Sequence, residues 1–172
     1  EPDVPVEKKA EHPFKIMDKT HPTPFIMDEW KKTYSNCTDY KEAMEYFWNK
    51  FDAEGWSIFR GDYKYNEECK VLFMTSNLIA GFIQRTEEIR KWLFGTMTIR
   101  GEEGSNMKVT AYYLIRGDSI KPLLDCNDDA DCYEWTKLSV PVSAEDKQRL
   151  YDYWCSEGPL DGEACLDSRC YK

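Results

Sequence analysis

Few residues of this chain could carry out proton transfer. His12 and His21 are the only histidines, and both lie in the first 24 of the 172 residues. Histidine is the usual base of a Ser-His-Asp or Cys-His site, because its pKa lies near neutrality. The rest of the chain lacks that base. The sequence therefore predicts no catalytic residues and argues against an ordinary hydrolase.

The seven cysteines and an acidic run are the remaining candidates for chemistry. Five residues separate Cys126 from Cys132, and four separate Cys165 from Cys170. Neither spacing is the two-residue spacing of a zinc knuckle, and no histidine completes a ligand set. The acidic run at residues 125–131 lacks the glycine and the terminal glutamate of a calcium-binding EF-hand loop. We expect no metal and no cofactor, and the sequence leaves open whether either cysteine pair forms a disulfide.

A thiol-based redox or other small-molecule-binding module is the alternative function. A reactive thiol needs a depressed pKa, which a neighbouring cation can supply. Cys69, directly followed by Lys70, is the candidate for such a thiol.

The sequence offers more side chains suited to binding another protein than to catalysis or metal binding. Arg and Trp are favoured where a surface binds a partner tightly. Gly117 follows Arg116 at the end of an apolar run, where glycine permits a turn and a close approach. Alternation over residues 133–137 places Trp135 and Lys137 on one face of a strand. The candidate partner-binding residues are Gln84, Arg85, Arg116, Gly117, Trp135 and Lys137.

Two of these candidates have a competing interpretation. Arg85 and Arg116 could form internal salt bridges, for which Glu87, Glu88 and Asp118 are available nearby in the sequence. An arginine that is paired inside the fold would stabilise the domain and would not meet a partner.

The charge balance limits the classes of partner. The net charge is −9, and residues 125–172 carry 12 acidic and 5 basic side chains. Such a surface repels phosphate, so we expect no direct nucleic acid partner. It could attract a basic protein, or it could serve only as a solvated surface. The sequence contains no apolar run of membrane length, so we expect no membrane partner.

The elements that must position these residues are of mixed type. Residues 1–24 hold most of the prolines and many charges, which predicts a flexible linker before a domain at residues 25–172. Apolar spacings of three and four predict helices, and a capping box at Ser143 and Asp146 predicts the last one. We expect helices at residues 28–34, 38–51, 77–89 and 143–155, and strands at residues 56–65, 70–75, 94–100, 107–116 and 133–140. The strands at 94–100 and 107–116 form a hairpin, and the segment after Gly158 is a polar tail. The fold class is therefore α+β with a largely antiparallel sheet.

Several ordered blocks carry a family resemblance. The pattern Y-F-W-x-x-F-D-x-x-G-W-S occupies residues 46–57, and further blocks lie at residues 27–36, 77–85 and 113–117. Together they resemble the C-terminal domain of the gamma subunit of translation elongation factor 1, from about Phe25 to about Gly158. The resemblance implies a curved antiparallel sheet flanked by helices, following a linker. It does not cover the C-terminal cysteines.

The resemblance also implies a function. It is that of a non-catalytic, cytoplasmic scaffold domain, which supports guanine nucleotide exchange on elongation factor 1-alpha during translation elongation. The implied partners are the alpha, beta and delta subunits of the elongation factor 1 complex, with an aminoacyl-tRNA synthetase as a further candidate.

Overall fold

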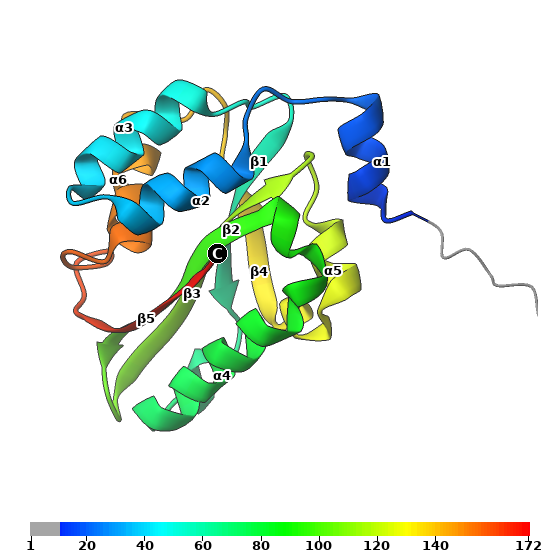
Figure 1. Cartoon of the computed structure of the whole chain (residues 1–172). Coiled ribbons are helices and arrows are strands. Elements are labelled where there is room, and N and C mark those ends of the chain that lie inside the picture. The colour runs from blue at the N-terminus through cyan, green and yellow to red at the C-terminus, as the bar shows by residue number, and fades with distance from the viewer. Residues whose placement is uncertain (1–10) are drawn as a thin grey trace, which may run out of the picture.

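A computed structural model describes residues 11–172 of the chain, and Figure 1 shows the arrangement of its elements. Helices and strands alternate irregularly along the sequence, as expected for an α+β fold. The helices are α1 (Pro13–Thr20), α2 (Met27–Asn36), α3 (Tyr40–Lys50), α4 (Leu72–Arg85), α5 (Lys121–Cys126) and α6 (Ala144–Cys155). The 3-10 helices are η1 (Asn66–Glu68), η2 (Glu87–Trp92) and η3 (Asp128–Cys132). The strands are β1 (Trp56–Tyr63), β2 (Leu93–Glu102), β3 (Asn106–Arg116), β4 (Tyr133–Lys137) and β5 (Cys165–Tyr171).

The strands form one five-stranded sheet in the order β4-β1-β3-β2-β5. Each neighbouring pair is antiparallel. The long β2–β3 hairpin is the centre of the sheet, where Thr98 lies opposite Thr110. The sheet is open, so β4 and β5 are its two edges.

Both faces of the sheet are covered by helices, which gives two apolar cores (Figure 1). Alternate side chains along each strand point to opposite faces. Ile58 and Phe94 join the core beneath α2, α3 and α6. Phe59 and Leu93, one residue away, join the core that contains Phe14 of α1 and the inner side of α4. The predicted α+β class, with a curved, largely antiparallel sheet flanked by helices, is confirmed.

Local sequence signals explain where several elements begin and turn. Ser143 caps α6, because its Oγ accepts a hydrogen bond from the Asp146 amide at 3.1 Å. The tip of the β2–β3 hairpin contains Gly101 and Gly104, whose φ angles of 110° and 86° favour glycine. The predicted start of the last helix at Ser143 and the predicted hairpin are therefore both confirmed.

The prediction of a flexible linker is wrong for the segment that forms α1. Phe14 of this helix is fully buried, with its ring 5.3 Å from that of Trp92. A proline at the first position of a helix costs no hydrogen bond, so the proline-rich composition did not exclude this structure. Residues 1–10 of the predicted linker lie outside the part of the chain that is described.

Two further segments differ from the prediction. Residues 70–75 were expected to form a strand, but α4 begins at Leu72 and includes most of them. The expected polar tail contains β5, which pairs with β2 from Gly95 to Arg100. In both cases tertiary contacts decide the structure, because short segments of this kind have no strong periodicity of their own.

Candidate interaction surface

The first turn of α4 exposes large apolar side chains. Phe73 is 73% exposed and Met74 is 68% exposed. Val71, just before the helix, and Tyr65, just before η1, are also exposed. We call these four residues the α4 apolar face. Single exposed apolar residues are ordinary, but a cluster of them marks an interaction site.

The sequence of α4 explains why these residues face outward. The inner side of the helix buries Thr75, Ile79 and Phe82, spaced by four and three residues. Phe73 then lies on the opposite side, and Met74 lies on the flank of the helix, about 100° around the axis from Thr75. The start of the helix is fixed by the β2–β3 hairpin, because the Leu72 amide donates a hydrogen bond to Glu103 Oε1 at 3.0 Å. The exposed turn is therefore held in a defined position.

A groove runs beside the α4 apolar face. It consists of two adjoining cavities of about 350 Å³ and 220 Å³, and both are lined by Tyr63, Met74 and Leu78. The larger one extends to Phe82, Arg85 and residues of η3 and β4, and the smaller one extends to η1. A groove lined by aromatic and thioether side chains is suited to the apolar side of a partner segment.

Charged side chains of both signs line this groove, including Lys70 in the smaller cavity. Glu68 lines the smaller cavity and Asp129 lines the larger one, while Glu103 lies at the start of α4. The main cation of the larger cavity, Arg85, is already paired with Asp129 at 2.5 Å between Nη1 and Oδ2. The charged side chains that line the groove therefore balance, and its apolar side chains favour the apolar side of a partner segment.

The predicted partner-binding residues are only partly brought together here. Arg85 lines the groove, and Gln84 is exposed next to it in α4. Trp135 is half-buried against Phe82, and its indole donates a hydrogen bond to the Ala130 carbonyl at 2.9 Å. Trp135 therefore supports the groove from below. Lys137 is exposed at the other end of β4, where it lies opposite Phe59 of β1.

Arg116 is not a partner-binding residue, because its side chain is only 1% exposed. Its Nε donates to Asp18 Oδ1 at 3.0 Å and its Nη1 donates to the Gly55 carbonyl at 2.6 Å. Its Nη2 donates to the carbonyls of Met17 and His21. The alternative of an internal salt bridge is correct, although the acidic partner is Asp18 of α1 and not Asp118.

The structure explains why position 117 is a glycine. Its φ of 88° is a conformation that side chains rarely adopt, and a Cβ there would approach Met17 of α1. Its amide donates to the Gly55 carbonyl at 2.8 Å. The lack of a side chain at Gly117 thus leaves room for Met17 of α1. Gly117 therefore permits the packing of α1 that Arg116 holds in place.

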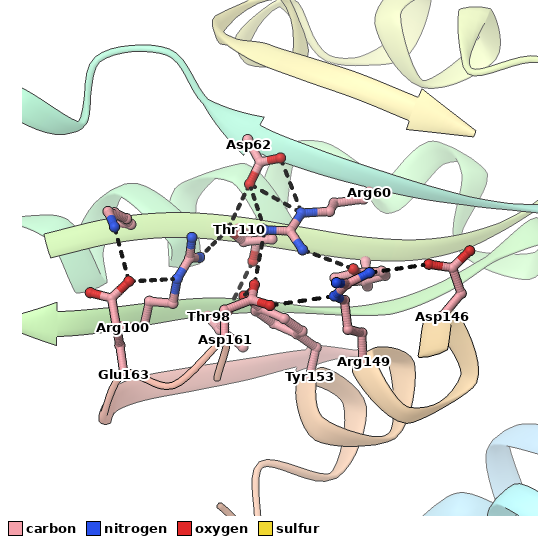
Figure 2. A network of polar contacts seen from close by, with 12 residues as sticks. Arg60, Asp62, Thr98, Arg100, Thr110, Asp146, Arg149, Tyr153, Asp161 and Glu163 are labelled. Carbon is pink, nitrogen blue, oxygen red and sulfur yellow. Dashed lines mark hydrogen bonds and ion pairs between the residues drawn. The ribbon is translucent and has the colours of Figure 1, made fainter. Parts of the chain in front are cut away.

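A second polar cluster joins the sheet, α6 and the loop before β5 (Figure 2). Arg60 of β1 pairs with Asp161 at 3.1 Å, and Tyr153 of α6 donates a hydrogen bond to the same carboxylate at 2.5 Å. Burial alone would raise the pKa of Asp161, but the Tyr153 hydrogen bond and the charge of Arg60 hold that pKa below its usual value. Arg100 and Lys108 pair with Glu163 in the same way. The cluster therefore fastens the loop before β5 to the sheet.

The thiols do not have the environment of a reactive site. Burial raises the pKa of the Cys69 thiol, although Lys70 is adjacent in the sequence. All seven cysteines are unpaired in the structure, including Cys126, Cys132, Cys165 and Cys170. Within residues 11–172, no cluster of three or more His, Cys, Asp or Glu side chains is placed to hold a metal ion. In the same residues, no helix is both long and apolar enough to span a membrane.

The sequence reasoning missed Phe73 and Met74. Their signal was present, because a helical period through Thr75, Ile79 and Phe82 leaves Phe73 on the outer side and Met74 on the flank of the helix. The expectation of a strand at residues 70–75 concealed it, since a strand would have alternated them between two faces.

Comparison with known proteins places the chain in a family. A family model described as elongation factor 1 gamma, conserved domain, matches residues 9–119. A probable elongation factor 1-gamma 2 of Arabidopsis thaliana is 41% identical over 95% of this chain and 39% of its own length. An elongation factor 1-gamma of Trypanosoma cruzi is 36% identical over 99% of the chain and 40% of its own length. The chain thus spans about two fifths of the length of these curated relatives, and it belongs to the elongation factor 1-gamma family.

Proposed function

We propose that this domain is a non-catalytic docking module of the elongation factor 1 complex. It acts in translation elongation in the cytoplasm, and it supports guanine nucleotide exchange on elongation factor 1-alpha by holding subunits together. Membership of the elongation factor 1-gamma family supports the proposed role in translation elongation. The α4 apolar face is the observation that supports docking, because Phe73 and Met74 expose apolar area without an internal partner.

The occupant that fits this face is an amphipathic segment of another subunit of the complex. Its apolar residues would cover Phe73 and Met74 and enter the groove beside Leu78. Its polar residues would meet the charged side chains of the groove, which include Glu68, Lys70 and Asp129. Burial of apolar area contributes most of the affinity, and the charged side chains set the orientation.

A thiol-based activity is the less favoured alternative. It requires a thiolate near neutral pH, whereas burial raises the pKa of Cys69 and raises the pKa of Cys170 to about 11. The docking proposal requires no ionised thiol.

The test is a binding measurement with purified alpha, beta and delta subunits of the complex. We expect one of them to bind the chain, and we expect the double variant Phe73→Ser/Met74→Ser to weaken that binding by about 2 kcal/mol or more, as for central interface residues. The melting temperature should stay unchanged, because both side chains are exposed.

A matched control removes two exposed apolar side chains elsewhere. Ile16 of α1 is 48% exposed and Ile26, before α2, is 53% exposed. The Ile16→Ser/Ile26→Ser variant should bind as the unchanged chain does. Equal loss in both variants, or unchanged binding in the Phe73 variant, would show that the α4 apolar face is not the docking site.

A further inference from the structure

A basic cleft lies on this acidic protein, away from the α4 apolar face. It is a cavity of about 590 Å³ between α2, η2 and the end of β5. Asp28 is the only carboxylate side chain among its lining residues. Five cations line it, namely Lys31, Lys32, Arg90, Lys91 and Lys172. A chain with a net charge of −9 thus gathers positive charge from three separate elements at one place.

Most of these cations have no anionic partner of their own. Arg90 pairs with Glu87 at 3.2 Å. Within residues 11–172, Lys32, Lys91 and Lys172 form no ion pair within 4.0 Å. Like charges that are held together repel one another, and a bound anion relieves that repulsion.

Lys31 forms the floor of the cleft. Its Nζ donates to the Arg90 carbonyl at 2.7 Å and lies 6.0 Å from the centre of the Tyr171 ring. These contacts connect α2 to η2 and to the end of β5. Burial, followed by the charge of Arg90, lowers the pKa of Lys31, which means that both disfavour its charged form. An anion in the cleft would stabilise that charged form.

We propose that this cleft binds a short acidic segment of a partner protein, through several carboxylates at once. Four of its five cations are lysines, which act as point charges with rotatable donors and so can each meet a different carboxylate. A nucleic acid strand fits less well. None of the exposed large apolar residues lines the cleft to stack with bases, and the acidic remainder of the surface repels a long phosphate chain.

This site is separate from the proposed docking face. Helix α4 runs from the apolar face at Leu72 to Arg85, and η2, which contributes Arg90 and Lys91, follows it. In the described part of the chain, no residue that lines the cleft lines either cavity of the groove. One protein can therefore carry an amphipathic partner on the α4 apolar face and an acidic one in the cleft.

The test uses a fluorescent peptide of alternating Glu and Ser residues, and it measures binding to the chain by anisotropy. We expect binding that weakens as salt is added, because exposed charges are screened. Reversing two exposed cations with Lys32→Glu/Lys91→Glu should weaken binding by about tenfold or more, which corresponds to about 1.4 kcal/mol. Near-ultraviolet circular dichroism checks that the variant is folded.

The control reverses two exposed lysines on α3, with Lys41→Glu/Lys50→Glu, and it should leave binding unchanged. A uridine oligonucleotide of equal charge should bind less tightly than the peptide. Three results would overturn the proposal: no binding of the peptide, equal loss in both variants, or tighter binding of the oligonucleotide through Lys32 and Lys91. None of these results bears on the α4 apolar face, whose own variants test it.

Discussion

At the scale of single residues, Arg116 shows how one guanidinium can join distant parts of a chain. It binds Asp18 and the carbonyls of Met17 and His21 in the N-terminal segment, and it binds the Gly55 carbonyl at the start of β1. We expect Arg116→Ala to lower the free energy of unfolding by about 3 kcal/mol, because it leaves these buried acceptors without a donor. Urea denaturation measures the change.

Arg116→Lys is the informative companion variant. A single ammonium group can replace the charge but cannot reach all four partners, so we expect an intermediate loss of stability. An unchanged unfolding curve for Arg116→Ala would contradict this account and would return Arg116 to the list of surface residues.

The buried thiols predict how stability changes with pH. Burial raises the pKa of Cys155 from its ordinary value of 9.0 to about 12. The unfolded state loses this proton near pH 9, whereas the folded state keeps it. Stability is therefore complete below pH 9 and falls between pH 9 and 12, by up to about 1.4 kcal/mol per pH unit.

Urea denaturation at about pH 7 and about pH 10, with a reductant present, tests this sign. Cys155→Ala lacks the titrating group, so its stability should fall less between the two pH values than that of the unchanged chain. An equal fall in both proteins would show that Cys155 does not contribute.

At the scale of elements, α1 is the clearest case of structure that depends on contacts distant in sequence. Phe14 is fully buried, and the indole of Trp92 donates a hydrogen bond to Asp18 Oδ2 at 2.8 Å. We expect Phe14→Ala to cost about 3–5 kcal/mol. Ile16→Ala, on the exposed side of the same helix, should cost less than about 0.5 kcal/mol. Urea denaturation compares the two variants, and equal small losses would mean that α1 does not pack on the domain.

The elements divide into those with a local signal and those without one. The cap at Ser143 and the glycines of the β2–β3 hairpin are local, and both were predicted correctly. Strand β5 has no such signal, because it is an edge strand with half-buried residues that is defined by pairing with β2. The start of α4 depends on Glu103, which lies far along the chain.

At the scale of the whole molecule, the sequence placed some of the candidate residues and not others. Composition and spacing favour binding over catalysis, and Arg85 lines the groove beside the α4 apolar face. Arg116 could not be placed from the sequence, because its partner Asp18 lies in a segment that was expected to be a flexible linker. The two surface features at either end of α4 depend on which residues the fold brings together.

If the domain only docks subunits, it should have no effect of its own on nucleotide exchange. We expect this chain alone to leave the rate of nucleotide release from elongation factor 1-alpha unchanged, because docking supplies no groups to the nucleotide site. Release of a fluorescent guanine nucleotide measures this directly. An acceleration of many-fold by the chain alone would contradict a pure docking role.

Amide hydrogen exchange with and without the purified alpha, beta and delta subunits tests the docking claim most directly. Exchange should slow in the first turn of α4 and in η1, because a partner on Phe73 and Met74 would cover both segments. The Phe73→Ser/Met74→Ser variant should lose that protection while the protection of β2 and β3 stays the same. Binding of a subunit with no change in exchange at α4 would contradict the account.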